Sequence, residues 1–400
     1  MYSFNEELQI IKNFVRIMAE RSGGSHNLGT ALISALIAMR MDLSPEKLYI
    51  SGLLHDIGAI GIFENFISEP LFFEKGQGYD EELTYHPEVS YRMVKELLGL
   101  DLIAIKEHHE LLNGQGYPIG LSGEDVSIEG YVLGIADKLE VLARSKEYNY
   151  HEIIKTIREW ENKWYPSSII DASMCLLIED RSILYDIQQA VSLERRINEC
   201  EKNFTFPDFI IDEKALLKFF SMSITLKHPY TSYHAERVSG LALKIGERIG
   251  LDKEAMRNLE ISAYLHDIGK VCIPRAVLDK PYVLEPSEVN IIKEHVLKTY
   301  EILNNSPITE EVAFISSSHH EAMDGSGYPL GLKGEEIPIL SRIINVVDIF
   351  DALTSSRAYR PALSLRGAVK TMEEKFYRKI DYDLFNILKV IIREENNYGL

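Results

Sequence analysis

Histidine is the residue that most clearly marks candidate chemistry in this 400-residue chain, because ten of its twelve histidines fall into one arrangement that occurs twice. LLHDIG and LHDIG place His55 and His266 211 residues apart, and HHELLNGQGYP and HHEAMDGSGYP, which start at His108 and His319, keep the same offset. Five histidines and an aspartate repeated in order are not independent accidents. The sequence therefore predicts an internal duplication.

The second copy contains imidazoles and carboxylates of the kind that bind borderline divalent metals such as Fe, Mn, Co or Zn. Its candidate residues are His234, His266, Asp267, His295, His319, His320 and Asp348. Seven groups exceed the needs of one ion. Adjacent residues on a helix point about 100° apart, so the pairs 266/267 and 319/320 can each address two neighbouring ions. A two-metal centre with a bridging aspartate and a water held between the ions follows, which suits in-line phosphoester hydrolysis.

The elements that position these residues have helical periodicity. Leu241, Ile245 and Ile249 recur at every fourth residue, the stretch 285–305 opens with Pro and Ser as start signals, and a helix beginning at Thr309 delivers His319 and His320 at its end. Gly and Pro punctuate residues 325–338, which indicates a loop, and helical pattern resumes over 340–360. Alternation typical of strands is scarce. We predict an all-α fold of two tandem helical bundles.

Length favours two domains, and 46% hydrophobic with 26% charged residues excludes a disordered chain. Residues 198–214 lack a helical stripe and contain Pro207, so the predicted domains are 1–205 and 206–400. No apolar run approaches the ~20 residues of a membrane span, and the first residues do not form a signal peptide. We expect a cytoplasmic protein without membrane contact. Three cysteines without close spacing predict buried free thiols.

The net charge of −18 argues against binding to polymeric nucleic acid, which requires basic surface. The charge is also uneven, because Lys, Arg, Asp and Glu sum to −14 over residues 1–200 and to −4 over residues 201–400. The second copy is therefore the better candidate for an anionic substrate.

The second copy resembles the HD-GYP branch of the HD-domain superfamily, metal-dependent phosphohydrolases known for hydrolysing cyclic di-GMP. The resemblance covers the C-terminal half and lies in HAERV (234–238), HDIGK (266–270), EHV (294–296), HHEAMDGSGYP (319–329) and the stretch 342–360. It implies that the seven residues above are the metal ligands, with Asp267 bridging. It also implies that Lys270 reaches the scissile phosphate or the attacking water, and that Tyr328 shapes the substrate pocket.

The same resemblance assigns phosphate binding to Arg357 and Arg360, which lie one helical turn apart, so both guanidinium groups can face one anion. It favours iron or manganese. Some members of the family bind three metals through a Glu four residues before the first ligand His. Tyr230 stands at that position here, which favours two metals, although His228 could complete a third site.

The first copy keeps the ligand types but not the cations. Its matching residues are His26, His55, Asp56, His86, His108, His109 and Asp137. Ala59 stands at the position of Lys270, and at constant offset Lys146 and Asn149 stand at those of the two arginines, while Tyr117 and Pro118 remain. We expect a divergent domain with a regulatory, structural or differently specific role. Whether it binds metal is left open.

The leading hypothesis is a phosphodiesterase that cleaves cyclic di-GMP to pGpG and GMP in the C-terminal domain, with a metal-bridging hydroxide as nucleophile. One alternative is hydrolysis of another nucleotide, such as cyclic GMP-AMP or a nucleoside phosphate, because fold and metals do not select the base. A second alternative is a noncatalytic sensor of cyclic dinucleotides. The sequence is compatible with a homo-oligomer but does not fix the oligomeric state.

Overall fold

A computed structural model describes most of the chain as helices. The residues described are 4–19, 26–60, 81–145, 149–206, 212–227, 233–280, 282–304, 308–356 and 361–396. Over these ranges there is no β-strand and only one isolated bridge, between Glu161 and Tyr165. The all-α prediction is confirmed. None of the described helices is long and apolar enough to cross a membrane.

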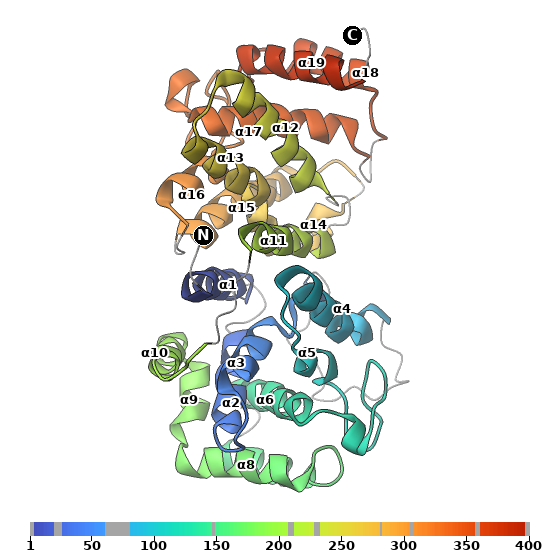
Figure 1. Cartoon of the computed structure of the whole chain (residues 1–400), viewed down its shortest axis with the longest axis vertical. Coiled ribbons are helices and arrows are strands. Elements are labelled where there is room, and N and C mark those ends of the chain that lie inside the picture. The colour runs from blue at the N-terminus through green and yellow to red at the C-terminus, as the bar shows by residue number, and fades with distance from the viewer. Residues whose placement is uncertain are drawn as a thin grey trace. The chain divides into compact units, whose positions relative to one another are not determined.

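The chain divides into two compact units, Met1–Phe219 and Phe220–Leu400 (Figure 1). The boundary that the sequence predicts near residue 205 lies in the connection between α10, which ends at Glu201, and α11, which begins at Glu213. The two compact units divide later, between Phe219 and Phe220, which lie within α11.

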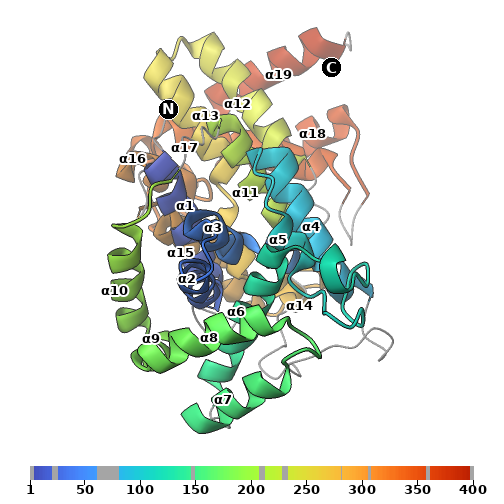
Figure 2. The ribbon, with the colours of Figure 1, turned by 60° about the horizontal axis from the view of Figure 1, so that its bottom comes forward.

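In the first unit, α2 packs against α3 and α6, and α8 and α7 both contact α6 (Figure 2). Its elements are α1 (Phe4–Ala19), α2 (His26–Ala38), α3 (Pro45–Leu54), η1 (Ile57–Ala59), α4 (Glu81–Leu98), α5 (Ile103–Glu107), η2 (Gly123–Asp125), α6 (Ile128–Arg144), α7 (Tyr150–Glu159), α8 (Ser167–Glu179), α9 (Ser182–Gln188) and α10 (Ala190–Glu201). The division between the units falls within α11 (Glu213–Lys227).

In the second unit, α12 packs against α13 and α17, and α15 packs against η4 and α16. Its elements are α12 (His234–Ile249), α13 (Lys253–Leu265), η4 (Ile268–Cys272), α14 (Arg275–Leu278), α15 (Pro286–Asn304), α16 (Glu310–Ser317), η5 (Gly334–Glu336), α17 (Ile339–Thr354), α18 (Leu365–Lys375) and α19 (Tyr382–Asn396). Apart from α14, this order repeats the order from α2 to α8, as a duplication requires.

Local signals explain where the helices of the second unit begin and end. The Asp252 side chain accepts a hydrogen bond from the Ala255 N–H at 2.8 Å and caps α13, while Gly250 ends α12 with a φ of 75°. Thr309 caps α16 as predicted, but this helix ends at Ser317. The two histidines that follow therefore lie in a turn and not on the helix.

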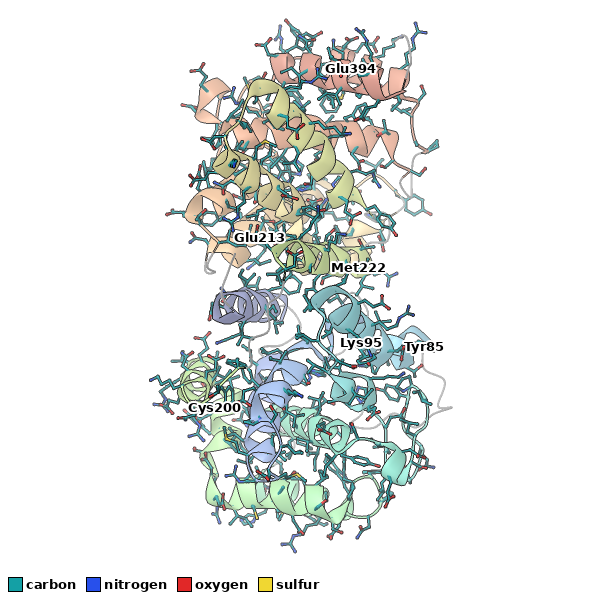
Figure 3. The ribbon with its side chains drawn as sticks, viewed as in Figure 1. Tyr85, Lys95, Cys200, Glu213, Met222 and Glu394 are labelled. Atoms are coloured by element: carbon teal, nitrogen blue, oxygen red, sulfur yellow. The ribbon has the colours of Figure 1, made fainter. Side chains whose placement is uncertain are left out.

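The core of the second unit lies between α12, α13, α17, α18 and α19. Fully buried side chains such as Ile245, Ile343 and Phe385 fill it. In Figure 3, Glu394 lies on the outer side of α19, where it pairs with Arg248 of α12. The apolar side of α19 thus covers the core, and its charged side faces water.

The three cysteines are free thiols, as predicted. Cys200 and Cys272 are buried, whereas Cys175 is exposed because it lies on the outer side of α8. The prediction that all three are buried is wrong for this residue.

Candidate metal centres

One group of candidate ligands in the second unit joins three separate helical segments. His234 is the first residue of α12, His266 directly follows α13, and Asp348 lies on α17. One ligand atom from each lies within 4.8 Å of the others. The His234 Nε2 is 3.3 Å from the His266 Nε2 and 3.4 Å from the Asp348 Oδ1. Such a triangle of two imidazoles and a carboxylate suits one divalent ion.

A second group of ligands lies beside the first and consists of three imidazoles. His295 on α15 meets His319 and His320 of the turn after α16, again with all ligand atoms within 4.8 Å. From the sequence we expected the neighbours 319 and 320 to address different ions. The structure places them in one group, because α16 ends before them and both rings lie against His295.

Asp267 stands between the two groups. Its Oδ2 is 3.4 Å from the His266 Nε2 and 3.8 Å from the His234 Nε2, and its Oδ1 is 3.4 Å from the His295 Nε2 and 3.9 Å from the His319 Nε2. Each carboxylate oxygen therefore faces one group. This is the position from which a carboxylate bridges two ions.

Hydrogen bonds fix the tautomers of these histidines. The Nδ1 atoms of His266, His295 and His319 lie 2.6–2.8 Å from the backbone carbonyl three residues earlier. Since a carbonyl only accepts, Nδ1 carries the proton and Nε2 presents a lone pair. Within the part of the chain that the structure describes, the buried Nε2 atoms of His295 and His319 and the Asp267 Oδ1 have no hydrogen-bond partner. Leaving such atoms unpaired costs about 1–3 kcal/mol each, so the donor set fits bound metal.

His234, the first residue of α12, has a side chain as the partner of its Nδ1 instead of a backbone carbonyl. Its Nδ1 donates to the Asp351 Oδ2 at 2.7 Å, and the Arg237 guanidinium holds the same carboxylate at 2.6 and 2.9 Å. Asp351 is 3% exposed. Sequence reasoning missed this residue, although an acidic residue, Glu140, stands 211 residues earlier and could have revealed it.

Replacing Asp351 with asparagine is expected to weaken metal binding at the group of His234 by about 10–100-fold, because the carboxylate orients the ring and raises its basicity. Competition with a graded series of chelators, with metal counted per chain, measures this change. Glu374→Gln, which removes an exposed carboxylate, is the matched control. An unchanged affinity in Asp351→Asn would show that the contact does not support the ligand.

Electrostatics keep most of these groups in their ligating forms. Burial lowers the pKa of His295 to about 3 and that of His320 to about 4, so both rings are neutral near pH 7. Although burial acts in the opposite direction, Lys270 and His266 hold the pKa of Asp267 well below its usual range. Metal therefore meets little competition from protons at these atoms.

Lys270 and Tyr328 lie against the ligands. The Lys270 ammonium bonds the Asp267 carboxylate. The Tyr328 ring lies 4.9 Å from the His320 ring at 32°, with the Lys293 ammonium 5.0 Å from its centre. Arg357 and Arg360, and also Tyr230 and His228, lie outside the described residues, so their roles stay predictions.

Another residue that sequence reasoning missed holds the Gly-Tyr-Pro loop in place. Glu321, which is 2% exposed, accepts hydrogen bonds from the backbone N–H groups of Leu330, Gly331 and Leu332 at 2.6–3.2 Å. In the first unit Glu110 does the same for Ile119, Gly120 and Leu121. The carboxylate that follows each His-His pair thus fixes the loop that carries the tyrosine.

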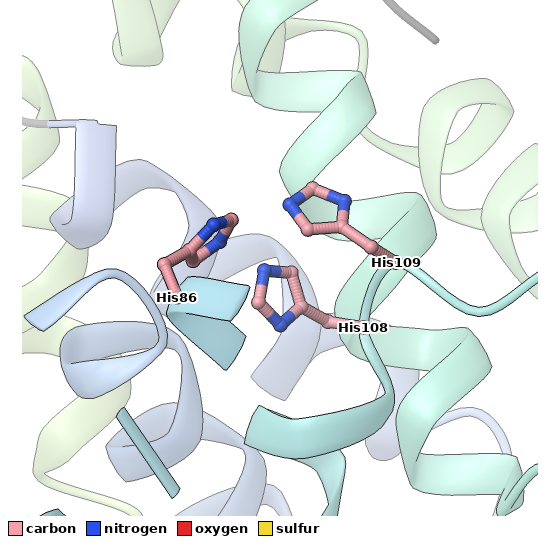
Figure 4. Close-up of side chains that lie close together, drawn as sticks. All are labelled: His86, His108 and His109. Atoms are coloured by element: carbon pink, nitrogen blue, oxygen red, sulfur yellow. The ribbon is translucent and has the colours of Figure 1, made fainter. Parts of the chain in front are cut away.

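The first unit assembles the same arrangement from its own residues. One group is His26, His55 and Asp137, and another is His86, His108 and His109 (Figure 4). Asp56 lies between them, with its Oδ2 3.3 Å from the His55 Nε2 and its Oδ1 3.2 Å from the His86 Nε2. The seven residues that the sequence nominated here are therefore brought together as well.

Comparison with known proteins agrees with this duplication. Two family models described as HD domain match residues 23–142 and 218–384. The 3′3′-cGAMP-specific phosphodiesterase 3 of Vibrio cholerae is 30% identical over 366 residues, which are 90% of this chain and 76% of that protein. The chain belongs to the HD-GYP family.

Other relatives of this HD-GYP protein match about half of it. The cyclic di-GMP phosphodiesterase response regulator RpfG of Xanthomonas campestris is 40% identical over 46% of this chain and 47% of its own length, and a cyclic di-GMP phosphodiesterase of Thermotoga maritima is 39% identical over 46% and 50%. The chain thus spans about half the length of these two relatives. The crystal structure of a cyclic GMP-AMP-specific phosphodiesterase of V. cholerae, V-cGAP3, shares the fold with a TM-score of 0.63 at 24% identity, covering 97% of both chains.

The two HD domains differ in how the first histidine is held. In the N-terminal domain the His26 Nδ1 lies 2.6 Å from the Glu140 Oε2, and Arg144 pairs with that carboxylate. The C-terminal domain has Asp351 at the position of Glu140, but its arginine comes from α12 instead of α17. Both domains thus place a carboxylate and a guanidinium beside the first histidine. The carboxylates stand at matching positions, whereas the arginines do not.

The constant offset fails beyond Ser145. Asn149 caps α7 by accepting from the N–H groups of His151 and Glu152, and its counterpart is Ser364, which caps α18. The connection is therefore 145–149 in the N-terminal domain and 355–364 in the C-terminal one. The two helix caps therefore pair Asn149 with Ser364, whereas the constant offset pairs it with Arg360. Lys146 lies outside the described residues.

The lowered histidine pKa values of the HD-GYP domain predict an acid-sensitive metal-free protein. An imidazole with a lowered pKa stays neutral in the folded chain while the unfolded chain takes up a proton below pH 6.5, so stability present above that pH is lost as the pH falls. His295, His319 and His320 act in this direction. Although burial acts in the opposite direction, Asp267 raises the pKa of His266, so the stability that this residue contributes is constant below pH 6.5.

We therefore expect the free energy of unfolding of the metal-free chain to fall between pH 6.5 and 5 by about 1 kcal/mol per pH unit for each lowered histidine. Urea unfolding of chelator-treated protein at pH 7, 6 and 5 measures it. The aspartates titrate only below their ordinary pKa of 3.8 and do not contribute in this window. Stability that stays level or increases over this range would contradict the prediction.

Proposed function

We propose that the C-terminal HD-GYP domain is a metal-dependent phosphodiesterase that hydrolyses cyclic di-GMP to pGpG and GMP. The observation that carries the proposal is the position of Asp267 between two groups of ligands, with the Lys270 ammonium beside it. Relatives that match this half of the chain at 39–40% identity are named cyclic di-GMP phosphodiesterases, which supports the choice of substrate.

Two divalent ions, proposed as iron or manganese, supply a water of lowered pKa and neutralise phosphate charge when bound. Asp267 would contribute to holding both ions, since it faces both groups of candidate ligands. His234, His266 and Asp348 would hold one ion, and His295, His319 and His320 the other, each imidazole oriented by the hydrogen bond at its Nδ1. Lys270, 19% exposed at its side chain, would stabilise the negative charge that develops on the phosphoryl oxygens.

Groups around the ligands would position the rest of the substrate. Tyr328 lies beside the ring of His320, with Lys293 near its face, and would contact the substrate there. Arg357 and Arg360 are proposed to hold the second phosphate of the cyclic dinucleotide. Cytoplasmic location and oligomeric state stay predictions.

A second candidate substrate is 3′3′-cGAMP. A relative that is similar along both domains is named as specific for it, and a 3′3′-linked dinucleotide offers the metals the same phosphodiester. The two candidates differ in one base only. Residues that contact the bases therefore decide between them, whereas the ligands do not.

Turnover of a nucleotide panel tests the proposal. Anaerobically purified full chain, loaded with iron or manganese and its metal counted, is incubated with cyclic di-GMP, 3′3′-cGAMP, pGpG and a nucleoside triphosphate, and products are separated by chromatography. We expect cyclic di-GMP to give pGpG and then GMP. Faster cleavage of 3′3′-cGAMP would select the second candidate. Tight binding of the dinucleotides without any product would instead indicate a sensor and contradict the proposal.

A further inference from the structure

We propose that the N-terminal HD domain is a second phosphate-binding centre, in which Lys138 supplies the cation that Lys270 supplies in the C-terminal domain. The ligand is a small phosphate ester that presents a single phosphoryl group to the centre. The comparison with Lys270 rests on the proposed function of the C-terminal domain, but the N-terminal site is argued from its own residues.

Lys138 is a lysine in an unusual place. It lies on α6 next to the ligand Asp137, is 5% exposed, and its Nζ is 3.9 Å from the Asp137 Oδ2. Burial of an ammonium is costly unless opposite charge lies nearby. At the matching position the C-terminal domain has Ile349, while Ala59 occupies the position of Lys270. Each domain therefore places one lysine beside one of its ligand carboxylates, but from a different element.

The charge of the ligands together with the adjacent lysine is consequently the same in the two centres. Each has two ligand aspartates and one adjacent lysine, and with two divalent ions bound each sums to +3 (four positive charges from the ions, one from lysine, minus two). With Ala59 at the position of Lys270, the sequence predicted a centre poorly suited to an anionic dinucleotide. Lys138 supplies beside Asp137 a positive charge that the comparison of matched positions did not reveal, and this charge would attract an anion.

The first histidine of this domain also keeps a carboxylate and an arginine beside it, although the arginine comes from a different helix. Arg237 of α12 is replaced by Gly29 of α2, and a Cβ on that glycine would lie 2.7 Å from the Glu140 Cγ. The longer Glu140 fills the space and takes its arginine from Arg144, one turn further along α6. His26 keeps a carboxylate at its Nδ1, so its Nε2 stays directed at the other ligands, 3.2 Å from the Asp137 Oδ1.

The size of the ligand follows from the connection after α6. In the C-terminal domain residues 355–364 carry the arginines that are proposed to hold a second phosphate, whereas 145–149 is about half as long. Within it, Asn149 is occupied as the cap of α7. The sequence of this shorter connection contains no arginine, whereas the longer one contains two. This favours a phosphate ester with a single phosphoryl group over a cyclic dinucleotide.

Phosphate binding to the full chain tests the proposal, with inorganic phosphate as the probe. Manganese-loaded protein is titrated by calorimetry, and metal per chain is counted in the same samples. We expect four metals and two phosphates per chain. Lys138→Ile, which introduces the residue of the C-terminal domain, should keep four metals and weaken one phosphate site about 10–100-fold. Lys155→Met, on the exposed side of α7, is the control and should change nothing.

A reciprocal variant separates charge from packing. Ala59→Lys combined with Lys138→Ile moves the lysine to the position it has in the C-terminal domain and should restore the second phosphate site. Lys138→Gln checks that loss of charge alone has the effect. Unaltered phosphate binding in Lys138→Ile, loss of metal in that variant, failure of the reciprocal variant to restore binding, or fewer than four metals in the natural chain would each overturn the proposal. Lys270→Met, in contrast, should weaken only the phosphate site of the C-terminal domain. If that site binds phosphate equally well in this variant, the function proposed for the C-terminal domain is contradicted instead.

Discussion

Replacing Asp267 with asparagine is expected to lower turnover of the cyclic dinucleotide by at least about a thousandfold, while the chain stays folded. The carboxylate faces one ligand group with each oxygen, at 3.4 Å to a nitrogen in either group. Asparagine keeps one oxygen and places an amide nitrogen, which has no lone pair for a metal, at the other side. The variant can therefore hold an ion in one group but cannot bridge two.

Metal content distinguishes this explanation from general damage. We expect Asp267→Asn to lose about one metal per chain and to melt within a few degrees of the natural chain when both are metal-free. Asp383→Asn, an exposed carboxylate at the start of α19, is the matched control and should keep full activity. Activity near the natural level in metal-replete Asp267→Asn would refute the assignment of the bridge.

The grouping of the candidate ligands was predictable because their motifs occur twice in the sequence. A histidine followed by an aspartate, and a pair of histidines followed by a glutamate, recur at a fixed offset. Metal ligation demands those residue types at those places. The helical fold was predictable for a similar reason, since caps such as Asp252 and Thr309 act on their own helix. These are local or repeated signals, which a single sequence contains.

Residues that supply the same charge from positions that do not match between the two domains were not predictable in this way. At the position that matches Lys270 the N-terminal domain has Ala59, so a comparison of positions indicates that the lysine is lost. The lysine that replaces it, Lys138, lies on another helix. Likewise Arg144 replaces Arg237 from a different element, and the structure shows that each pairs with the carboxylate beside the first histidine of its own domain. Packing in three dimensions permits several positions to deliver one charge, and a fixed offset cannot express that.

A second large effect is expected from the glycine of the His-Asp-Ile-Gly segment. A Cβ at Gly269 would lie 2.0 Å from the His295 carbonyl oxygen and 2.6 Å from the Thr299 backbone nitrogen. Both are backbone atoms of α15, which cannot move aside without displacing the helix. The Gly269 N–H also donates to the Thr299 hydroxyl at 3.0 Å, so η4 and α15 are held in close contact at this point.

We therefore expect Gly269→Ala to lower the free energy of unfolding of the C-terminal domain by at least about 3 kcal/mol. Metal affinity should fall as well, because η4 begins directly after Asp267 and α15 carries His295, so separating them pulls the bridge away from its ligand. Denaturant titration of the metal-free chain, followed by metal counting, measures both effects.

Gly240→Ala provides the matched control for this substitution. Gly240 lies on the exposed side of α12, and a Cβ there would meet no atom within 4 Å. The change should stabilise the chain by about 0.5–1 kcal/mol, since alanine favours helix over glycine. If Gly269→Ala were as stable as Gly240→Ala, η4 would not be held against α15 as closely as described. The geometry assigned to the bridging carboxylate would then fail with it.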